Sequence, residues 1–367
     1  MHNYQKTLKE EMKSICFLIG DISYRGGAER ITLSVASKLA IKNKVTILSI
    51  AEFKVEDLIF DIHPAVQLET LNVKNWGQKS SLRKNYVKII FSLRKFIIAN
   101  SIDNLVNVQA TNMLWTLPAL LGVKVRTLCW EHSNFTSHKF LLHNVSISLA
   151  KKFADKIIVL TERDRVLWNT GKAITIANFP AFNMPDVKIE NKQKIFIAVG
   201  RFSYEKAFDR LIDIWEIVEK SIDLKDYHLA IFGEGDQESL LKDKIVEKGL
   251  KKIAINPFTK DIDLVYNKAS SIFMTSLFEG YPMVLIEALQ FAVPAIAFDV
   301  LTGPAEIIEP YKTGFLIADN DLNGFAEKII QIIEDEQLLY NLKSNCLEHR
   351  KKFKSDAILD KWNQLLN

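Results

Sequence analysis

The sequence contains little cysteine: Cys16, Cys129 and Cys346 are the only three among 367 residues. They lie far apart and without CxxC spacing, so we expect neither a disulfide framework nor a zinc site, and a reducing compartment fits. Glycine and proline are also scarce, with 14 and 9 residues, which excludes collagen-like sequence and a long disordered chain. The net charge of +4 is small and no block of Lys and Arg is present, so nothing indicates a nucleic-acid partner.

Long apolar runs are missing as well. Residues 15–20 are apolar, but Asp21 ends the run after too few residues for the core of a signal peptide, so we interpret it as a first buried strand. Residues 104–123 carry no charge, yet Asn107, Gln109 and Asn112 would be costly in hydrocarbon. A strand, a polar turn and a short helix account for this stretch better than a membrane span does. We therefore expect a soluble, cytoplasmic protein.

The chain does have a regular alternation of β-rich segments and segments with apolar residues at helical spacing. In the first half, strands are predicted at residues 14–20, 44–51, 103–108, 123–130, 156–160 and 173–177, and helices at residues 29–41, 80–99 and 141–153. Residues 178–194 lose this periodicity and are interpreted as a linker. The alternation then restarts, with strands at residues 194–200, 228–233, 253–256, 271–275 and 293–298, and helices at residues 205–220, 237–248, 282–290, 323–334 and 336–353.

This pattern predicts an α/β protein, because alternating strands and helices form parallel sheets that are covered by helices on both faces. Two such blocks predict two Rossmann-like, doubly wound domains, residues 1–180 and 191–353, which face each other across a cleft. Ligands bind at the carboxyl ends of the strands in such sheets. The residues that directly follow the strands are therefore the candidates for a functional site.

Two adjacent glycines, Gly26 and Gly27, lie between the first strand and the first helix. Glycine lets the backbone approach an anion closely, and the free N–H groups at a helix start attract phosphate. The segment matches neither the dinucleotide fingerprint nor the phosphate loop, and a flexible turn is the alternative.

In the second half, Arg201 follows a strand and Lys206 lies near the next helix start, where two cations could neutralise a diphosphate. Ordinary surface charges are the alternative.

Residues 275–288 are the richest in candidate groups. Glu279 follows a strand, and Pro282 suits the first position of the next helix, which would leave the N–H groups of Met283 and Val284 free for an anion. Glu287 lies inside an otherwise apolar helix, where a carboxylate is costly unless it is hydrogen-bonded, for example by the vicinal hydroxyls of a sugar. A glutamate on the polar face of the helix is the alternative.

His132 follows the strand predicted at residues 123–130. A histidine at the carboxyl end of a strand could donate to a substrate oxygen or stabilise charge. A structural hydrogen bond is the more common role of a single histidine.

Glu279 and Glu287, with seven residues between them that include Gly280 and Pro282, resemble the EX7E motif of glycosyltransferase family 4. Members of that family are retaining enzymes of the GT-B fold that use nucleotide-activated sugars. The glycines at residues 26–27, the strand end at residues 200–206, the G-x-G turn at residues 232–235 and the loop at residues 303–314 resemble further motifs of the family, in the same order. The resemblance covers nearly the whole chain.

This resemblance implies a role for each candidate at the phosphate end of the donor. Arg201 and Lys206 would hold the diphosphate of a nucleotide sugar, and Gly26 and Gly27 would let the N-terminal domain close on it. The departing phosphate would itself take the acceptor proton, so no metal-binding acidic triplet is required, and we find no convincing DxD motif. The resemblance therefore implies catalysis without a metal or another cofactor.

The resemblance also assigns the sugar and the nucleoside. Glu287 would bind the ribose hydroxyls, Glu279 would contact the transferred sugar, and His132 would lie beside the sugar ring near the developing positive charge. The backbone that would cradle sugar and phosphate belongs to the turn between the glutamates: Gly280, Tyr281, Pro282, Met283 and Val284.

Two departures from the family pattern concern glycines. Ala207 stands where the family usually has Gly after its Glu-Lys pair, and we expect it to be tolerated on a helix. Residues 256–258 read Asn-Pro-Phe where a glycine near the base pocket is usual. This second change bears on base recognition, and UDP is the nucleotide we expect.

The helix predicted at residues 80–98 carries one apolar and one basic face. The apolar face, expected to point inward, comprises Leu82, Tyr86, Ile89, Ile90, Leu93 and Phe96, and the basic face comprises Arg83, Lys84, Lys88, Arg94 and Lys95, with no acidic residue in the span. A basic face suits an anionic membrane surface, and a solvated helix packed on the sheet is the alternative. Family members often use polyprenyl-diphosphate-linked acceptors, which favours peripheral attachment to the cytoplasmic face of the inner membrane.

The last segment, residues 354–367, has apolar residues at helical spacing, and the GT-B resemblance implies a helix that crosses back to the first domain. We expect a bacterial retaining hexosyltransferase that moves galactose, N-acetylgalactosamine or glucose from a UDP-sugar to a polyprenyl-diphosphate-linked or polysaccharide acceptor. A nucleotide-sugar epimerase of the same fold and a non-catalytic partner subunit are the alternatives. The presence of Arg201, Lys206, Glu279 and Glu287 argues against the partner subunit, because such residues are usually the first to be lost with activity.

Overall fold

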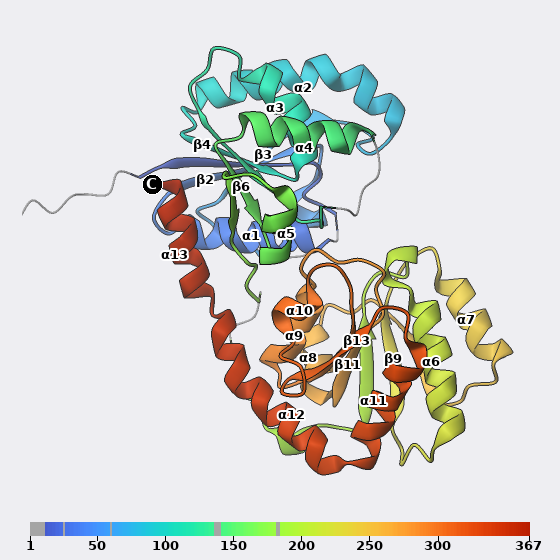
Figure 1. The fold of residues 1–367 in the computed structure, drawn as a ribbon. Coiled ribbons are helices and arrows are strands. Elements are labelled where there is room, and N and C mark those ends of the chain that lie inside the picture. The colour runs from blue at the N-terminus through green and yellow to red at the C-terminus, as the bar shows by residue number, and fades with distance from the viewer. Residues whose placement is uncertain (1–11, 25, 59–60, 136–140, 181–183) are drawn as a thin grey trace, which may run out of the picture.

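The computed structural model describes residues 12–24, 26–58, 61–135, 141–180 and 184–367. Its strands form two sheets, each covered by helices on both faces (Figure 1). The first sheet is parallel throughout and has seven strands in the order β3-β2-β1-β4-β5-β6-β7. These strands are β1 (Ser14–Ile19), β2 (Lys44–Ala51), β3 (Gln67–Val73), β4 (Asn104–Val108), β5 (Arg126–Trp130), β6 (Lys156–Val159) and β7 (Ala173–Thr175).

The second sheet is also parallel and has six strands in the order β10-β9-β8-β11-β12-β13. They are β8 (Ile195–Val199), β9 (His228–Gly233), β10 (Ile253–Pro257), β11 (Ser271–Met274), β12 (Ala295–Asp299) and β13 (Gly314–Ala318). The two-domain α/β architecture predicted from the sequence is confirmed.

The helices follow the strands in chain order. Those of the first half are α1 (Gly27–Leu39), α2 (Lys79–Ala99), α3 (Met113–Ala119), α4 (Leu141–Phe153) and α5 (Glu162–Trp168). Those of the second half are α6 (Phe208–Ser221), α7 (Glu238–Glu247), α8 (Ile262–Lys268), α9 (Met283–Gln290), α10 (Pro304–Ile307), α11 (Leu322–Glu334), α12 (Glu336–His349) and α13 (Ser355–Leu366). Short 3-10 turns lie at Val55–Asp57, Ala110–Asn112, Ile189–Asn191, Tyr204–Lys206 and Arg350–Phe353.

Several elements were missed or misplaced by the sequence analysis. Strand β3 was missed because it lies at the sheet edge, where only two of its seven residues are buried. Helices α5 and α8 are seven residues each, too short to show a helical period. Strand β13 was also missed, and β5 begins at Arg126 instead of residue 123.

Two helix starts near the predicted site differ from expectation. Pro282 precedes α9 in an extended conformation (φ −70°, ψ 100°), so the helix begins at Met283 and the expectation of Pro282 as its first residue was wrong. Ala207 was expected on a helix, but it has φ 47° and ψ 47° between the turn at Tyr204–Lys206 and α6. A left-handed alanine costs about 1–2 kcal/mol, which explains why glycine is the usual residue there.

The C-terminal helix α13 packs on the first domain, as expected (Figure 1). Trp362 is buried against Trp130 and Phe17, with ring centroids 4.8 and 6.0 Å away. The amide of Asn104 donates to the carbonyl of Leu366 at 3.2 Å. The chain therefore returns to the first sheet after completing the second.

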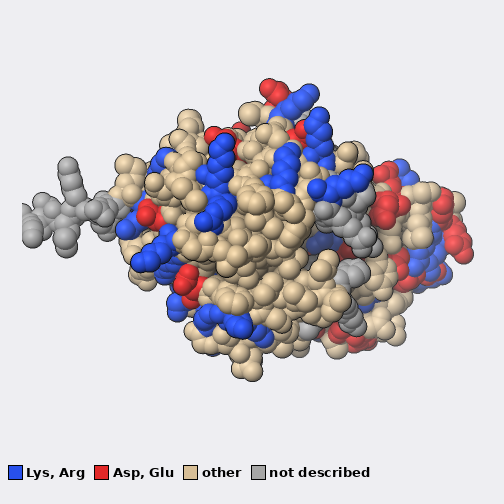
Figure 2. All heavy atoms as spheres, turned by 90° about the horizontal axis from the view of Figure 1, so that it is seen from above, with Lys and Arg blue, Asp and Glu red and all other residues tan. Residues whose placement is uncertain are grey.

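Helix α2 has an outward face that is both apolar and basic. Its buried residues include Ile89, Leu93 and Ile97, which pack on the first sheet. The expectation that Tyr86 would be buried with them was wrong, because it is 39% exposed; the side chains of Leu82 and Arg83 lie outside the described ones. The exposed stripe combines three apolar and three basic side chains: Val87, Phe91, Ile98, Lys84, Lys88 and Lys95. Figure 2 looks down on this side of the molecule and shows Lys and Arg side chains around a broad uncharged area.

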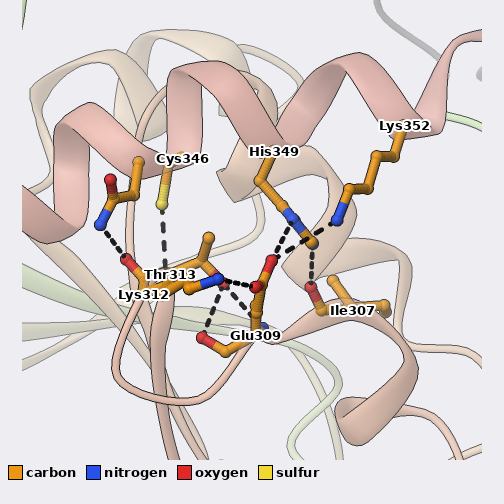
Figure 3. Close-up of polar contacts among 8 residues, drawn as sticks. Ile307, Glu309, Lys312, Thr313, Cys346, His349 and Lys352 are labelled. Carbon is orange, nitrogen blue, oxygen red and sulfur yellow. Dashed lines mark hydrogen bonds and ion pairs between the residues drawn. The ribbon is translucent and has the colours of Figure 1, made fainter.

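A polar cluster fastens α12 to the loop between α10 and β13 (Figure 3). The Glu309 carboxylate lies 3.1 Å from Nδ1 of His349 and also pairs with Lys312 and Lys352. The other ring nitrogen of His349 lies 3.1 Å from the carbonyl oxygen of Ile307. None of these residues lines the cavity described next, so the cluster supports the second domain from outside the site.

Candidate functional site

A cavity of about 1180 Å³ opens between the carboxyl ends of the two sheets. It is lined by residues that directly follow β1 and β5 in the first half and β8, β9, β10 and β11 in the second. This is where open parallel sheets bind ligands. The volume slightly exceeds the roughly 300–1,000 Å³ of ordinary small-molecule pockets, so an extended ligand would fit.

Most of the predicted site residues meet in this cavity. Those that line it are Gly26, Gly27, Arg201, Lys206, Glu279, Gly280, Met283, Val284 and Glu287. Three predicted residues are not among the lining residues: His132, Tyr281 and Pro282. Most of the residues singled out from the sequence therefore share one cavity, and their roles stay predictions.

The starts of α1 and α9 face each other across the cavity. Gly26 caps α1 in an extended conformation without a side-chain hydrogen bond. A Cβ atom on Gly27 would lie 3.9 Å from Cγ of Met283, the first residue of α9. Both helices thus direct backbone N–H groups and the positive ends of their dipoles toward the same space, which favours an anion there.

Arg201 directly follows Gly200 at the end of β8 and lines the cavity. Its guanidinium carbon lies 4.8 Å from the centre of the Tyr24 ring, which belongs to the first half of the chain. A planar guanidinium stacked on an aromatic ring keeps its edge free for bidentate contacts with phosphate. The stacking therefore orients a cation from one domain against the wall of the other.

Lys206 and Glu279 form an ion pair inside the cavity. Nζ of Lys206 lies 2.7 Å from Oε1 of Glu279, and the two side chains are 28% and 10% exposed. Lys206 stands at the end of the turn before Ala207, and Glu279 follows β11. Without a ligand the carboxylate partly neutralises the lysine, so an incoming phosphate would compete with Glu279 for it.

Gly280 is required by a close backbone approach. A Cβ atom at this position would lie 2.1 Å from the carbonyl oxygen of His132, so no side chain fits between the two domains here. The carbonyl of the neighbouring Glu279 accepts a hydrogen bond from Nδ2 of Asn134 at 3.1 Å. These contacts fix the turn after β11 against the loop that follows β5.

His132 packs against Trp130, with ring centroids 4.3 Å apart. Its Nε2 is buried and has no hydrogen-bond partner within the described part of the chain. Burial lowers the pKa of His132 to about 3, so the imidazole is neutral at physiological pH. The backbone carbonyl of His132 lies next to the turn at Gly280, but His132 is not among the lining residues, and its catalytic role stays a prediction.

Glu287 is buried in α9 and bonded through both carboxylate oxygens. Oε1 lies 2.6 Å from Nη1 of Arg30, and Oε2 accepts a hydrogen bond from the Tyr266 hydroxyl at 3.1 Å. Burial raises the pKa of Glu287, whereas the charge of Arg30 and the hydrogen bond from Tyr266 lower it. The alternative of a glutamate on a solvated helix face was wrong, because this side chain is only 3% exposed.

Four residues at the site were missed as participants by the sequence analysis: Tyr24, Arg30, Asn134 and Tyr266. Arg30 did carry a signal, because a cation near the start of a helix opposes the helix dipole and calls for a compensating partner. The partner, Glu287, lies 257 residues away in sequence. Nothing in the local pattern of either residue could have identified the pair.

The G-x-G turn after β9 lies close to the strand end that carries Arg201. A Cβ atom on Gly233 would lie 1.9 Å from the carbonyl oxygen of Gly200, so only glycine fits between the two strand ends. Phe258, which follows β10, also lines the cavity. An aromatic side chain therefore occupies the loop where the family pattern has a glycine.

Within the described residues, no group of three or more His, Cys, Asp or Glu side chains is placed to hold a metal ion. Two of the acidic groups at the cavity are paired with cations, Glu279 with Lys206 and Glu287 with Arg30. Independence from metal stays a prediction. No helix in the described part of the chain combines the length and apolar character that crossing a bilayer requires.

Comparison with known proteins agrees with this geometry. Residues 181–355 match the family model described as glycosyl transferases group 1. The chain is 30% identical to the amylovoran biosynthesis glycosyltransferase AmsD of Erwinia amylovora and 29% identical to an uncharacterized glycosyltransferase of Haemophilus influenzae, in each case over 97% of this chain and 100% of the relative. Among solved structures, Staphylococcus aureus TarM has a TM-score of 0.80 at 17% identity, covering 97% of this chain and 99% of TarM.

A second solved structure, Anabaena HepE in complex with UDP and glucose, has a TM-score of 0.79 at 17% identity and covers 96% of this chain and 99% of HepE. At this level of identity, the likeness to TarM and HepE shows the fold alone. The full-length match to AmsD, the family model over the second domain and the cavity between two parallel sheets together establish that the chain belongs to the group 1 glycosyl transferases.

Proposed function

We propose that the chain is a retaining hexosyltransferase of glycosyltransferase family 4, which moves galactose, N-acetylgalactosamine or glucose from a UDP-sugar to a lipid-linked or polysaccharide acceptor. The observation that carries this proposal is that Arg201, Lys206 and the starts of α1 and α9 all line the same cavity. Cations and helix N-termini favour an anionic group such as a diphosphate.

The same groups supply the electrostatic part of catalysis. As the bond between the sugar and the diphosphate breaks, negative charge gathers on the leaving phosphate. Arg201, Lys206 and the N–H groups of the helix starts are already in place, so they stabilise this charge without reorganisation. Because Glu279 is 2.7 Å from Lys206, the sugar contacted by Glu279 would lie directly beside the phosphate.

The bond from the sugar C1 to the phosphate oxygen breaks, and a bond from C1 to the acceptor oxygen forms on the same face. The acceptor proton passes to the departing phosphate, so the protein needs no separate base. His132 is neutral because burial lowers its pKa to about 3. It would therefore not repel the positive charge that develops on the sugar.

Relatives support the donor and acceptor classes. TarM and HepE have been crystallised with UDP. A 23% identical protein of Campylobacter jejuni, matched over 97% of this chain and 98% of its own, is named as an N-acetylgalactosaminyltransferase acting on an undecaprenol-linked glycan. We extend both classes to this chain as part of the proposal, together with a cytoplasmic site of action.

Transfer is tested by incubating the purified protein in EDTA with each UDP-hexose and a crude polyprenyl-linked glycan acceptor. We expect acceptor-dependent release of UDP from one donor, and a product whose anomeric configuration by NMR matches that of the donor. Arg201→Ala is the inactive control. Interconversion of UDP-sugars without acceptor would indicate an epimerase, and an inverted product would refute the retaining mechanism.

We also propose that the outward face of α2 attaches the protein to an anionic membrane. Residues 79–99, 113–119 and 141–153, which form α2, α3 and α4, contain no acidic residue. The exposed apolar side chains of these helices include Val87 and Phe91 on α2 and Leu141 and Leu142 on α4. Cationic and apolar groups on one surface suit the headgroup region of a bilayer, and a lipid-linked acceptor would then lie nearby.

Co-sedimentation with liposomes tests this attachment. Wild-type protein should bind phosphatidylglycerol vesicles at low salt and be released at high salt, and Lys84→Glu with Lys88→Glu should abolish binding. A matched double reversal on the far domain, Lys242→Glu with Lys251→Glu, should retain it. Equal binding to neutral phosphatidylcholine vesicles would contradict the electrostatic part of the proposal.

A further inference from the structure

The carboxylate of Glu287 has one partner from each domain. Tyr266 belongs to α8, in the same domain as Glu287, and bonds Oε2 at 3.1 Å. Arg30 belongs to α1 of the first domain and reaches Oε1 at 2.6 Å. The side chains of Arg30 and Glu287 are 20% and 3% exposed, so the ion pair is largely shielded from solvent.

We propose that Arg30 is a positioning residue of the nucleotide site, which holds the Glu287 carboxylate in place for the ribose hydroxyls from the opposite domain. The inference rests on the proposed function, which assigns the ribose to Glu287. Arg30 of the first domain would thus complete the nucleotide site of the second domain. The ribose contact is fully formed only when α1 lies against α9.

The electrostatics of the pair give Arg30 this role. A buried carboxyl group without a cation favours its protonated form, and a protonated carboxyl is a poorer acceptor for two hydroxyl groups. Among the described residues, the titratable groups that act on Glu287 are Arg30 from α1 and Tyr266 from α8. Burial and the neighbouring Glu287 raise the pKa of Tyr266 far above its ordinary value, so Tyr266 remains a neutral donor and Arg30 supplies the charge.

The location of Arg30 agrees with an indirect role in nucleotide binding. Both Arg30 and Glu287 line the cavity, and Arg30 follows Gly26 and Gly27 by one turn of α1. A nucleotide with its diphosphate at the start of α1 and its ribose at Glu287 would therefore span the segment that carries Arg30. Removing Arg30 would disturb the ribose contact while Arg201 and Lys206 still hold the diphosphate.

The chain offers a matched control in a second ion pair between the domains. Arg163 of α5 lies 3.1 Å from Asp299 at the end of β12, with side chains 44% and 39% exposed. Neither residue lines the cavity. Arg163→Ala therefore removes a cation that bridges the domains but leaves Glu287 untouched.

The test is calorimetric titration of UDP and 2′-deoxy-UDP into the full-length protein and its variants. Arg30→Ala should weaken UDP binding at least about tenfold, within the range of ordinary coupling between sites, whereas Arg163→Ala should change it by less than about twofold. Arg30→Lys should restore part of the loss. The preference for UDP over 2′-deoxy-UDP should shrink in Arg30→Ala, because that preference depends on the ribose contact.

Two further readouts separate positioning from simple structural support. In a Glu287→Gln background, Arg30→Ala should cause no additional loss of affinity, because Arg30 acts through that carboxylate. The affinity of Arg30→Ala should also decline at a higher pH than that of wild type as the solution is acidified, because Glu287 without its cation takes up a proton earlier. If Arg30→Ala does not fold, the UDP affinities of Arg30→Lys and Glu287→Gln can still be measured and compared with that of the wild type.

Equal effects of Arg30→Ala and Arg163→Ala, or additive effects of Arg30→Ala and Glu287→Gln, would overturn the inference and leave the proposed function standing. If the unmodified protein bound no nucleoside diphosphate at all, the proposed function itself would fail, and the inference with it.

Discussion

Replacing Trp362 by alanine should detach the C-terminal helix from the first domain. Trp362 is 1% exposed and lies 4.8 Å from the ring of Trp130. Truncation of a large buried aromatic residue costs about 3–5 kcal/mol. The helix has only 12 residues, too few to be stable without packing, so the loss should not be compensated locally.

The magnitude can be checked by urea unfolding followed by tryptophan fluorescence. We expect the free energy of unfolding of the first domain to fall by about 4 kcal/mol, which corresponds to a midpoint lower by roughly 10 °C in thermal unfolding. Tyr340→Ala on α12, where the side chain is 47% exposed, is the matched aromatic control and should cost less than about 0.5 kcal/mol. A loss below about 1 kcal/mol for Trp362→Ala would refute the account of how α13 is anchored.

Three other predictions concern the site. Glu279→Gln should lower turnover about 100-fold or more and leave UDP affinity largely intact, whereas Arg201→Ala should weaken UDP binding itself; similar behaviour of the two variants in steady-state kinetics and calorimetry would contradict this division of roles. The pKa of His132 is about 3 in the folded protein and ordinary in the unfolded one, so protonation favours unfolding. Stability should therefore fall as the pH drops from about 6.5 toward 3, and His132→Gln should flatten this decline in urea unfolding. Ala207→Gly should stabilise the protein by about 1 kcal/mol, because Ala207 has φ 47°; an unchanged or lower midpoint would argue against strain there.

Much of the fold was predictable because it repeats a strong pattern. Buried strands such as β1 and β8 contain continuous apolar runs of five residues, and amphipathic helices such as α6 bury one face. The edge strand β3 could not be recognised, because its exposed positions carry polar residues. The predicted bounds of the helices near the site were wrong where the backbone conformation is irregular, as at Ala207 and Pro282.

The site could be predicted only in part, for a physical reason. Arg201 and Glu279 follow predicted strands, so topology alone brings them to the same edge of the sheet. The contact between Arg30 and Glu287 depends on how the two domains are oriented, and no local pattern encodes that. The packing of His132 on Trp130, two residues earlier in the same domain, depends on how the loop after β5 folds back.

Calorimetric titration of UDP into the purified protein in EDTA, with GDP and ADP as controls, tests whether the cavity binds a nucleotide sugar without metal. We expect selective binding of UDP at one site, and loss of that binding in Arg201→Ala. Binding of no nucleotide, or binding that requires a divalent cation, would contradict the assignment of the cavity between the two sheets as a metal-independent nucleotide-sugar site.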